Sequence, residues 1–138
     1  MNIIDLKITN LVQYKNQIYS VKEILQPKEG QYSVKIDNDL ESFTVPAESI
    51  DPILIDEDWL QKLGFQKTYS SAQRIRYERP EQFIKYDFDL TAKKVLEGLK
   101  IYGNSVRCRY IHEVQNIFSS LIGKPIFKNI KLDNSAVA

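Results

Sequence analysis

The sequence contains very little of the two side chains that most often build metal sites and thiol active sites. It has one cysteine, Cys108, and one histidine, His112, in 138 residues. A single cysteine cannot form a disulfide within the chain, so nothing indicates an oxidising compartment. A structural zinc site needs three or four ligands, and the segment HEVQN at 112–116 lacks the second histidine of the His-Glu-x-x-His motif. We therefore expect no bound metal and no cofactor.

Long apolar runs and a strong charge of either sign are also missing. No run approaches the ~20 apolar residues that a membrane span requires. The opening MNIIDLKITN lacks the basic start and apolar core of a signal peptide. The net charge of +1 excludes strong attraction of the whole molecule to nucleic acid. These absences predict a soluble cytoplasmic protein that makes no contact with a membrane.

The charge that is present is unevenly distributed along the chain. Residues 1–55 carry five lysines and eight acidic residues, a net charge of −3, whereas residues 56–138 carry fourteen basic and ten acidic residues, a net charge of +4. A chain of this length forms one domain or two small ones. The asymmetry favours two units, residues 1–55 and residues 56–132, followed by a disordered tail at 133–138.

The first unit reads as short strands separated by turns. Tyr32, Val34 and Ile36 alternate with polar residues, which is the pattern of a strand with one buried face. The segment PAESI at 46–50 reads as a single helical turn before the last of five strands. This pattern resembles a small β-barrel of the SH3 type. Barrels of this type bind peptides, bind nucleic acids, or contact only their neighbours.

Two groups of side chains in this unit bear on binding. The aromatic residues are Tyr14, Tyr19, Tyr32 and Phe43. They either line a groove for a peptide or a base or fill a small core, and the core is the more common use of such residues. The acidic residues Asp37, Asp39 and Glu41 argue against phosphate binding on their side of the unit.

The second unit opens with the clearest helix signal in the chain, DEDWLQKLGF at 56–65. Asp56 is suited to accept a free backbone N–H at the start of a helix, and Gly64 is suited to end it in the left-handed conformation. Phe65 can then pack back on Leu60. This pattern predicts a helix near residues 57–63.

Alternating strands and a second helix follow. The stretch 91–102 has helical spacing behind Thr91, but Gly98 weakens a helix, so we favour a strand that ends near Tyr102. The segment 111–122 is an amphipathic helix with a stripe of four apolar residues: Ile111, Val114, Phe118 and Leu121. Residues 126–132 have the pattern of an edge strand. The predicted fold class is α+β: an N-terminal SH3-like small β-barrel followed by an antiparallel β-meander with two helices.

The cysteine and the histidine lie only four residues apart, with Glu113 next to them, which raises the question of a thiol active site. A thiol nucleophile needs a histidine within hydrogen-bond reach. Cys108, however, lies on the inward-facing side of a predicted strand. At 100° per residue His112 falls among polar residues, off the apolar stripe of its helix. We expect a buried thiol, a histidine at the surface and no catalysis.

The remaining candidate site is a set of basic residues on predicted strands: Arg74, Arg76, Arg107, Arg109 and Lys85. Arginine side chains bind phosphates and carboxylates through paired hydrogen bonds. If the strands share one sheet with these sides aligned, four guanidinium groups lie on one surface. Glu78, Asp87 and Asp89 are placed to neutralise that surface as cross-strand pairs.

The segments DLKITNLVQY, DEDWLQKLGF and YIHEVQNIFSSLIGKPI together resemble small uncharacterised proteins of mobile genetic elements and phages of gut anaerobes. That family has no established activity, so the resemblance implies a two-part α+β chain and no particular chemistry. We expect a non-catalytic accessory or interaction module with a macromolecular partner. Nucleic-acid binding through the arginines is the alternative, and a thiol enzyme is the least favoured of the three.

Overall fold

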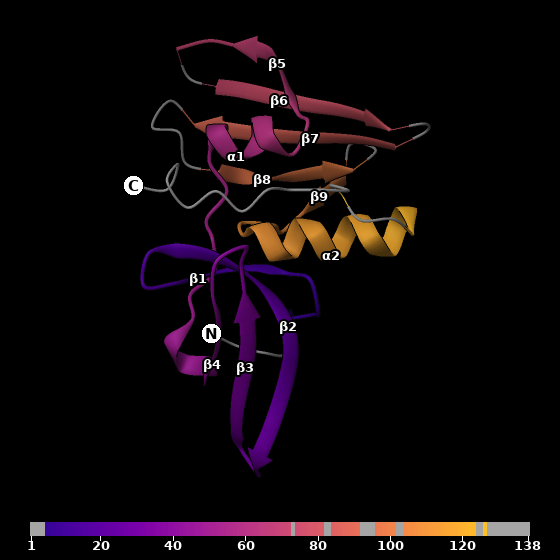
Figure 1. Ribbon diagram of the computed structural model, residues 1–138. Coiled ribbons are helices and arrows are strands. Elements are labelled where there is room, and N and C mark those ends of the chain that lie inside the picture. The colour runs from indigo at the N-terminus through magenta and orange to yellow at the C-terminus, as the bar shows by residue number, and fades with distance from the viewer. Residues whose placement is uncertain are drawn as a thin grey trace. The chain divides into compact units, whose positions relative to one another are not determined.

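The computed structural model describes residues 5–72, 74–81, 84–91, 96–101, 104–123 and 126. They form two compact units, Met1–Ile53 with Tyr110–Ala138 and Leu54–Arg109. The elements of the first unit (Figure 1) are β1 (Leu11–Tyr14), β2 (Gln17–Lys28), β3 (Gln31–Asp37), β4 (Ser42–Pro46), the short 3-10 helix η2 (Ala47–Ser49) and α2 (Ile111–Ile122). Those of the second are α1 (Glu57–Lys62), β5 (Gln66–Ser70), β6 (Arg74–Glu81), β7 (Ile84–Thr91), β8 (Leu96–Ile101) and β9 (Asn104–Val106).

The first unit contains an antiparallel sheet in the order β1-β2-β3-β4. Lys15 and Asn16 form the two-residue turn between β1 and β2, and both have positive φ, at 50° and 62°. Such a turn matches the natural twist of the strands it joins. The buried residues of the sheet and the following segment form one apolar core: Leu6, Val12, Tyr19, Val21, Val34, Ile36, Val45, Ala47 and Ile50.

The sheet is curled, as in small β-barrels, and the chain after β4 returns to its other edge. After η2, the predicted single helical turn, Gln13 and Asp51 exchange two backbone hydrogen bonds of 2.8 Å. The sequence predicted a fifth strand after this helical turn. That prediction is wrong in extent, because the pairing of Gln13 with Asp51 is an isolated bridge rather than a strand. Pro52 follows at once and has no N–H to continue the ladder.

The helix α2 has the predicted bounds but belongs to the first unit, so the expected division into 1–55 and 56–132 is wrong for this helix. The Ile111 N–H donates to the Ile53 carbonyl oxygen at 2.9 Å. Ile111, Val114 and Phe118 are buried as expected, but Leu121 is 51% exposed. The helix ends at Gly123, which has φ 75°. Leu121 therefore lies in the last turn, beyond the buried stripe.

The second unit is the predicted antiparallel meander, with strands in the order β5-β6-β7-β8-β9. The predicted helix before it is confirmed as α1, and the Asp56 side chain accepts the Trp59 N–H at 2.9 Å. At the other end Gly64 has φ 91°, and the Phe65 N–H donates to the Leu60 carbonyl at 2.9 Å. This pair of features is the usual glycine-based stop of a helix.

The ambiguous stretch 91–102 contains the strand β8, as favoured from the sequence. Residues 92–95 and 102 of this stretch lie outside the described residues. Of the expected edge strand at 126–132 only Ile126 is described, and the tail at 133–138 lies outside the described residues as well.

Candidate functional site

The two residues of the suspected thiol site fall in different units. Cys108 belongs to Leu54–Arg109 and is fully buried, as predicted, while Arg107 and Arg109 on either side of it are exposed. His112 belongs to the other unit, where it lies in the first turn of α2. The structure therefore does not assemble a thiol–imidazole pair within either unit.

The prediction of a surface histidine is wrong, because His112 is buried. Its ring stacks on the Tyr110 ring, with centroids 5.9 Å apart and an interplanar angle of 12°. Its Nδ1 atom has no hydrogen-bond partner among the described residues. Burial lowers the pKa of His112 below its usual 6.5, against a smaller opposing effect of the carboxylates of Glu113 and Asp5. The imidazole is thus held in its neutral form.

Two polar side chains of α2, Gln115 and Asn116, contact the segment from Asp5 to Leu11. The Leu11 N–H donates to Gln115 Oε1 at 2.9 Å, and Gln115 Nε2 donates to the Thr9 carbonyl at 3.2 Å. Asn116 Oδ1 accepts from Asn10 Nδ2 at 2.9 Å, and Asn116 Nδ2 donates to the carbonyl of Asp5 at 2.7 Å. Each amide side chain thus donates one hydrogen bond and accepts another, and all four join the helix to the segment from Asp5 to Leu11. These contacts join α2 to the first unit.

The arginines of the predicted binding face all lie on the second unit, but not side by side. Arg74 and Arg76 lie on β6, while Arg107 and Arg109 follow the end of β9. β7 and β8 separate these strands, so β6 and β9 are three strand spacings apart, roughly 14 Å. Lys85 lies on β7, and its side chain is outside the described part of the structure.

The register of the sheet also places acidic residues among these basic ones. Arg76 is paired with Asp89, and Glu78 is paired with Asp87, which is paired in turn with Lys100 on β8. Directly paired residues occupy the same face of an antiparallel sheet. The register therefore sets Asp89 opposite Arg76 and Lys100 opposite Asp87 on neighbouring strands.

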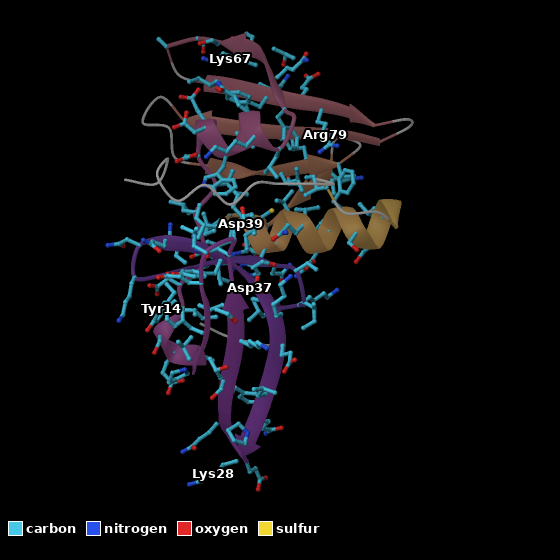
Figure 2. The ribbon with its side chains drawn as sticks, in the orientation of Figure 1. Tyr14, Lys28, Asp37, Asp39, Lys67 and Arg79 are labelled. Atoms are coloured by element: carbon cyan, nitrogen blue, oxygen red, sulfur yellow. The ribbon has the colours of Figure 1, made fainter. Side chains whose placement is uncertain are left out.

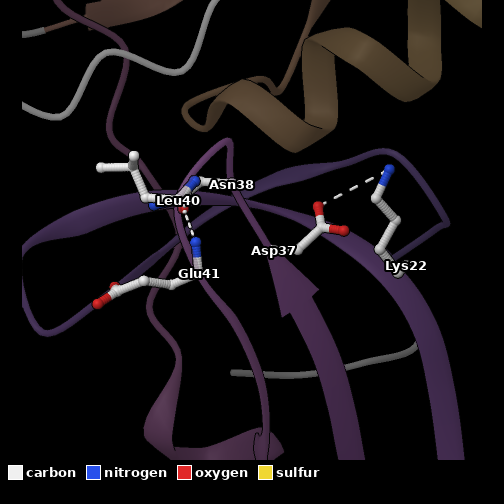
Figure 3. Close-up of polar contacts among 5 residues, drawn as sticks. All are labelled: Lys22, Asp37, Asn38, Leu40 and Glu41. Carbon is white, nitrogen blue, oxygen red and sulfur yellow. Dashed lines mark hydrogen bonds and ion pairs between the residues drawn. The ribbon is translucent and has the colours of Figure 1, made fainter.

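A different surface emerges at the turn between β3 and β4 in the first unit. The Asn38 side chain accepts the backbone N–H groups of Leu40 and Glu41 at 2.9 and 2.8 Å, and the Asn38 N–H donates to the Glu41 carbonyl at 2.9 Å (Figure 3). Three hydrogen bonds thus fix the four-residue turn at 38–41. The turn displays Leu40, whose side chain is the most exposed of the large apolar residues described, at 86%.

The turn is connected to a group of aromatic rings. Glu41 Oε2 accepts a 3.0 Å hydrogen bond from the Tyr19 hydroxyl, which burial and this carboxylate hold at a raised pKa. The rings of Tyr14, Tyr19 and Phe43 lie 5.9–6.2 Å apart, centroid to centroid, in edge-on or tilted contact. Such contacts stabilise beyond the area they bury.

Three of the four aromatic residues lie in or against the core, the more common of the two uses that the sequence left open. Tyr19 belongs to the core, and Tyr14 and Tyr32 pack against it while remaining partly buried. Phe43, by contrast, is 39% exposed. We refer to Tyr14, Leu40, Glu41 and Phe43 together as the turn surface.

The sequence does carry a signal for the turn surface, namely a leucine inside the otherwise polar segment DNDLE at 37–41. The turn pattern alone does not tell whether this leucine is exposed or folds back onto the core. An ion pair of 3.7 Å between Lys22 and Asp37 neutralises one carboxylate of that segment (Figure 3). Asp39 and Glu41 remain exposed. The turn surface therefore combines apolar side chains with the carboxylate of Glu41, and Asp39 adds a second carboxylate on the same turn.

Comparison with protein-family models, with curated proteins and with solved structures finds no match to this chain. No helix among the described residues is long and apolar enough to cross a membrane. The same residues contain no group of three or more His, Cys, Asp and Glu side chains that could hold a metal ion. The resemblance to proteins of phages and mobile elements stays a prediction.

Proposed function

We propose that the chain is a cytoplasmic, non-catalytic interaction module that binds a partner protein through the turn surface. The observation that carries the proposal is the exposure of Leu40 on a turn that is already ordered. Burying one fully exposed leucine in an interface contributes roughly 1.5–3 kcal/mol. Because the turn is fixed by Asn38, little of this is offset by ordering the backbone on binding.

The first unit is proposed to have the SH3-like fold. Its antiparallel order β1-β2-β3-β4, the helical turn η2 after β4 and the return of Asp51 to β1 support this assignment. In this arrangement the β1–β2 turn and the β3–β4 turn, with Lys15 and Glu41, belong to one curled sheet and contribute to one surface.

A protein is a better partner for the turn surface than a nucleic acid. Asp39 and Glu41 are exposed on its border, and carboxylates repel phosphates. The same carboxylates complement a basic segment, while Leu40 and Phe43 complement apolar side chains. The partner segment is therefore basic and apolar together.

The proposal is tested with a fluorescent library of short peptides that combine basic and apolar residues, titrated into the full chain at low salt. Leu40→Ser removes the exposed anchor and is expected to weaken the best binders by at least tenfold, corresponding to about 1.4 kcal/mol. The matched control is Leu25→Ser, because Leu25 is a leucine 39% exposed on β2, outside the turn surface. Equal losses in the two variants, or no binding by any peptide, would refute the proposal.

Nucleic-acid binding is a second candidate, favoured by the exposure of Arg107 and Arg109 on the unit that also holds Arg74 and Arg76. It predicts binding of mixed oligonucleotides that weakens steeply with added salt, because neutralising phosphates releases counterions. It also predicts loss of that binding in the double variant Arg107→Glu, Arg109→Glu. A flat titration at low salt excludes this candidate and leaves the first one untouched.

A further inference from the structure

The ring of Tyr14 already carries a positive charge supplied by its own chain. The ammonium nitrogen of Lys15 lies 5.4 Å from the centroid of the Tyr14 ring. A cation within about 6 Å of a ring centroid is attracted by the negative face of the ring. Tyr14 is only partly buried and Lys15 is exposed. An exposed lysine of the same turn therefore lies over this ring face.

The surroundings of this ring favour a cation over an anion. The Tyr14 ring contacts Tyr19 and Phe43, and the Tyr19 hydroxyl donates to Glu41. On the same turn as Glu41, Asp39 is exposed and makes no hydrogen bond or ion pair within the described residues. The Tyr14 ring thus lies beside the partly exposed ring of Phe43, and the carboxylate of Glu41 reaches the neighbouring Tyr19.

We infer that Tyr14 is the docking site for an arginine side chain of the partner segment, and that Lys15 occupies this site in the free protein. The inference rests on the proposed function and names the chemistry that the turn surface selects. The arriving guanidinium stacks on the Tyr14 ring, displaces the Lys15 ammonium and faces the carboxylates of Asp39 and Glu41. An apolar residue of the same segment then covers Phe43 and Leu40.

Arginine suits this site better than lysine. Its guanidinium group is planar, stacks on aromatic faces, is more weakly hydrated than an ammonium and presents a fork of donors to a carboxylate. Lysine at position 15 is a weaker competitor for the ring for the same reasons. Its position is nevertheless well defined, because Lys15 and Asn16 are held in the two-residue turn between β1 and β2.

Removing the competitor is expected to improve binding of the partner segment. Lys15→Asn deletes the ammonium, and asparagine tolerates the left-handed conformation of this position, φ 50°. An exposed cation–π contact corresponds to about a two- to fivefold change in affinity. Lys15→Asn should therefore bind arginine-containing peptides about two to five times more tightly than the unmodified chain does.

The control separates this local effect from the change in net charge. Lys28→Asn removes the same charge at the tip of the β2–β3 hairpin, away from Tyr14 (Figure 2). Lys28 lies eleven residues along β2 from Gln17, the residue paired with Tyr14, on the order of 30 Å. This exceeds the screening length of about 8 Å at physiological salt, so the control should leave affinity almost unchanged.

The experiment titrates three peptides that differ at one position, with arginine, lysine or uncharged citrulline, into the full chain and the two variants. Tighter binding of the arginine peptide, a further gain in Lys15→Asn but not in Lys28→Asn, and no gain for the citrulline peptide support the inference. Equal affinities for the three peptides, or equal effects of the two variants, overturn it while the proposed function stands. If no basic peptide binds, the inference and the proposed function both fail.

Discussion

Gln115 attaches α2 to the rest of the first unit. The loss of stability on removing this side chain can be calculated from its hydrogen bonds. Gln115 accepts the Leu11 N–H and donates to the Thr9 carbonyl. Gln115→Ala removes both hydrogen bonds and changes no apolar contact of the buried stripe. Alanine is also the best helix former, so the helix itself loses nothing.

The size of the effect follows from where the two backbone groups lie. Leu11 is almost completely buried, so its N–H is left without a partner away from water, which costs about 1–3 kcal/mol. The bond to the Thr9 carbonyl is exposed, and water replaces it at a cost of about 0.5 kcal/mol. We expect Gln115→Ala to lower the free energy of unfolding of the first unit by about 2–3 kcal/mol.

Hydrogen exchange of the backbone amides, combined with urea denaturation, measures this loss where it occurs. Exchange of the Leu11 amide should accelerate by a factor of about 30 or more in Gln115→Ala, since each 1.4 kcal/mol is tenfold. The control Ser120→Ala lies on an exposed position of the same helix and should change stability by less than about 0.5 kcal/mol. If Gln115→Ala behaves like Ser120→Ala, the polar face of α2 does not hold the helix to the sheet, and the reasoning is wrong.

Four further outcomes are expected, each measured by urea denaturation. Asn38→Ala removes the acceptor that orders the β3–β4 turn and should cost about 1 kcal/mol, whereas Asn38→Asp keeps the acceptor; equal losses would contradict this role. Because the pKa of buried His112 is lowered, the unfolded chain takes up a proton more readily than the folded chain does, so stability should fall as the pH falls below about 6.5. His112→Gln should flatten this dependence, and identical pH curves for the two proteins would refute the account. Tyr77→Phe deletes the hydroxyl that donates to Glu57 at 2.6 Å and should lower the free energy of unfolding by about 1.5–3 kcal/mol. Gly64→Ala places a side chain at φ 91° and should lower it by about 1–2 kcal/mol. Unchanged stability in either variant would contradict the role given to that residue.

Local chemistry made several features predictable from the sequence. Asp56 and Gly64 mark the two ends of α1 because each satisfies a requirement of a helix terminus that needs no distant partner. Gly123 ends α2 in the same way. The burial of Cys108 between two exposed arginines follows from the alternation of an extended chain, which is also local.

The errors share one physical cause, because each depended on a partner far away in the chain. The polar face of α2 looks solvated, yet Gln115 and Asn116 bond to backbone groups more than 100 residues earlier. The helix belongs to the first unit, and His112 in its first turn is buried. A spacing rule within one helix carries no information about which segment satisfies its polar side chains.

The candidate sites divide in the same way. The sequence by itself determined the α+β class, the order of the elements and which residues could do chemistry, because helix ends, turns and alternation act over a few residues. Only the tertiary structure decided that an acidic residue is paired with Arg76 in the sheet, that Leu40 stands exposed on its turn, and that the rings of Tyr14 and Phe43 meet. Register and surface exposure are set by contacts between strands, and those contacts have no local signature in the chain.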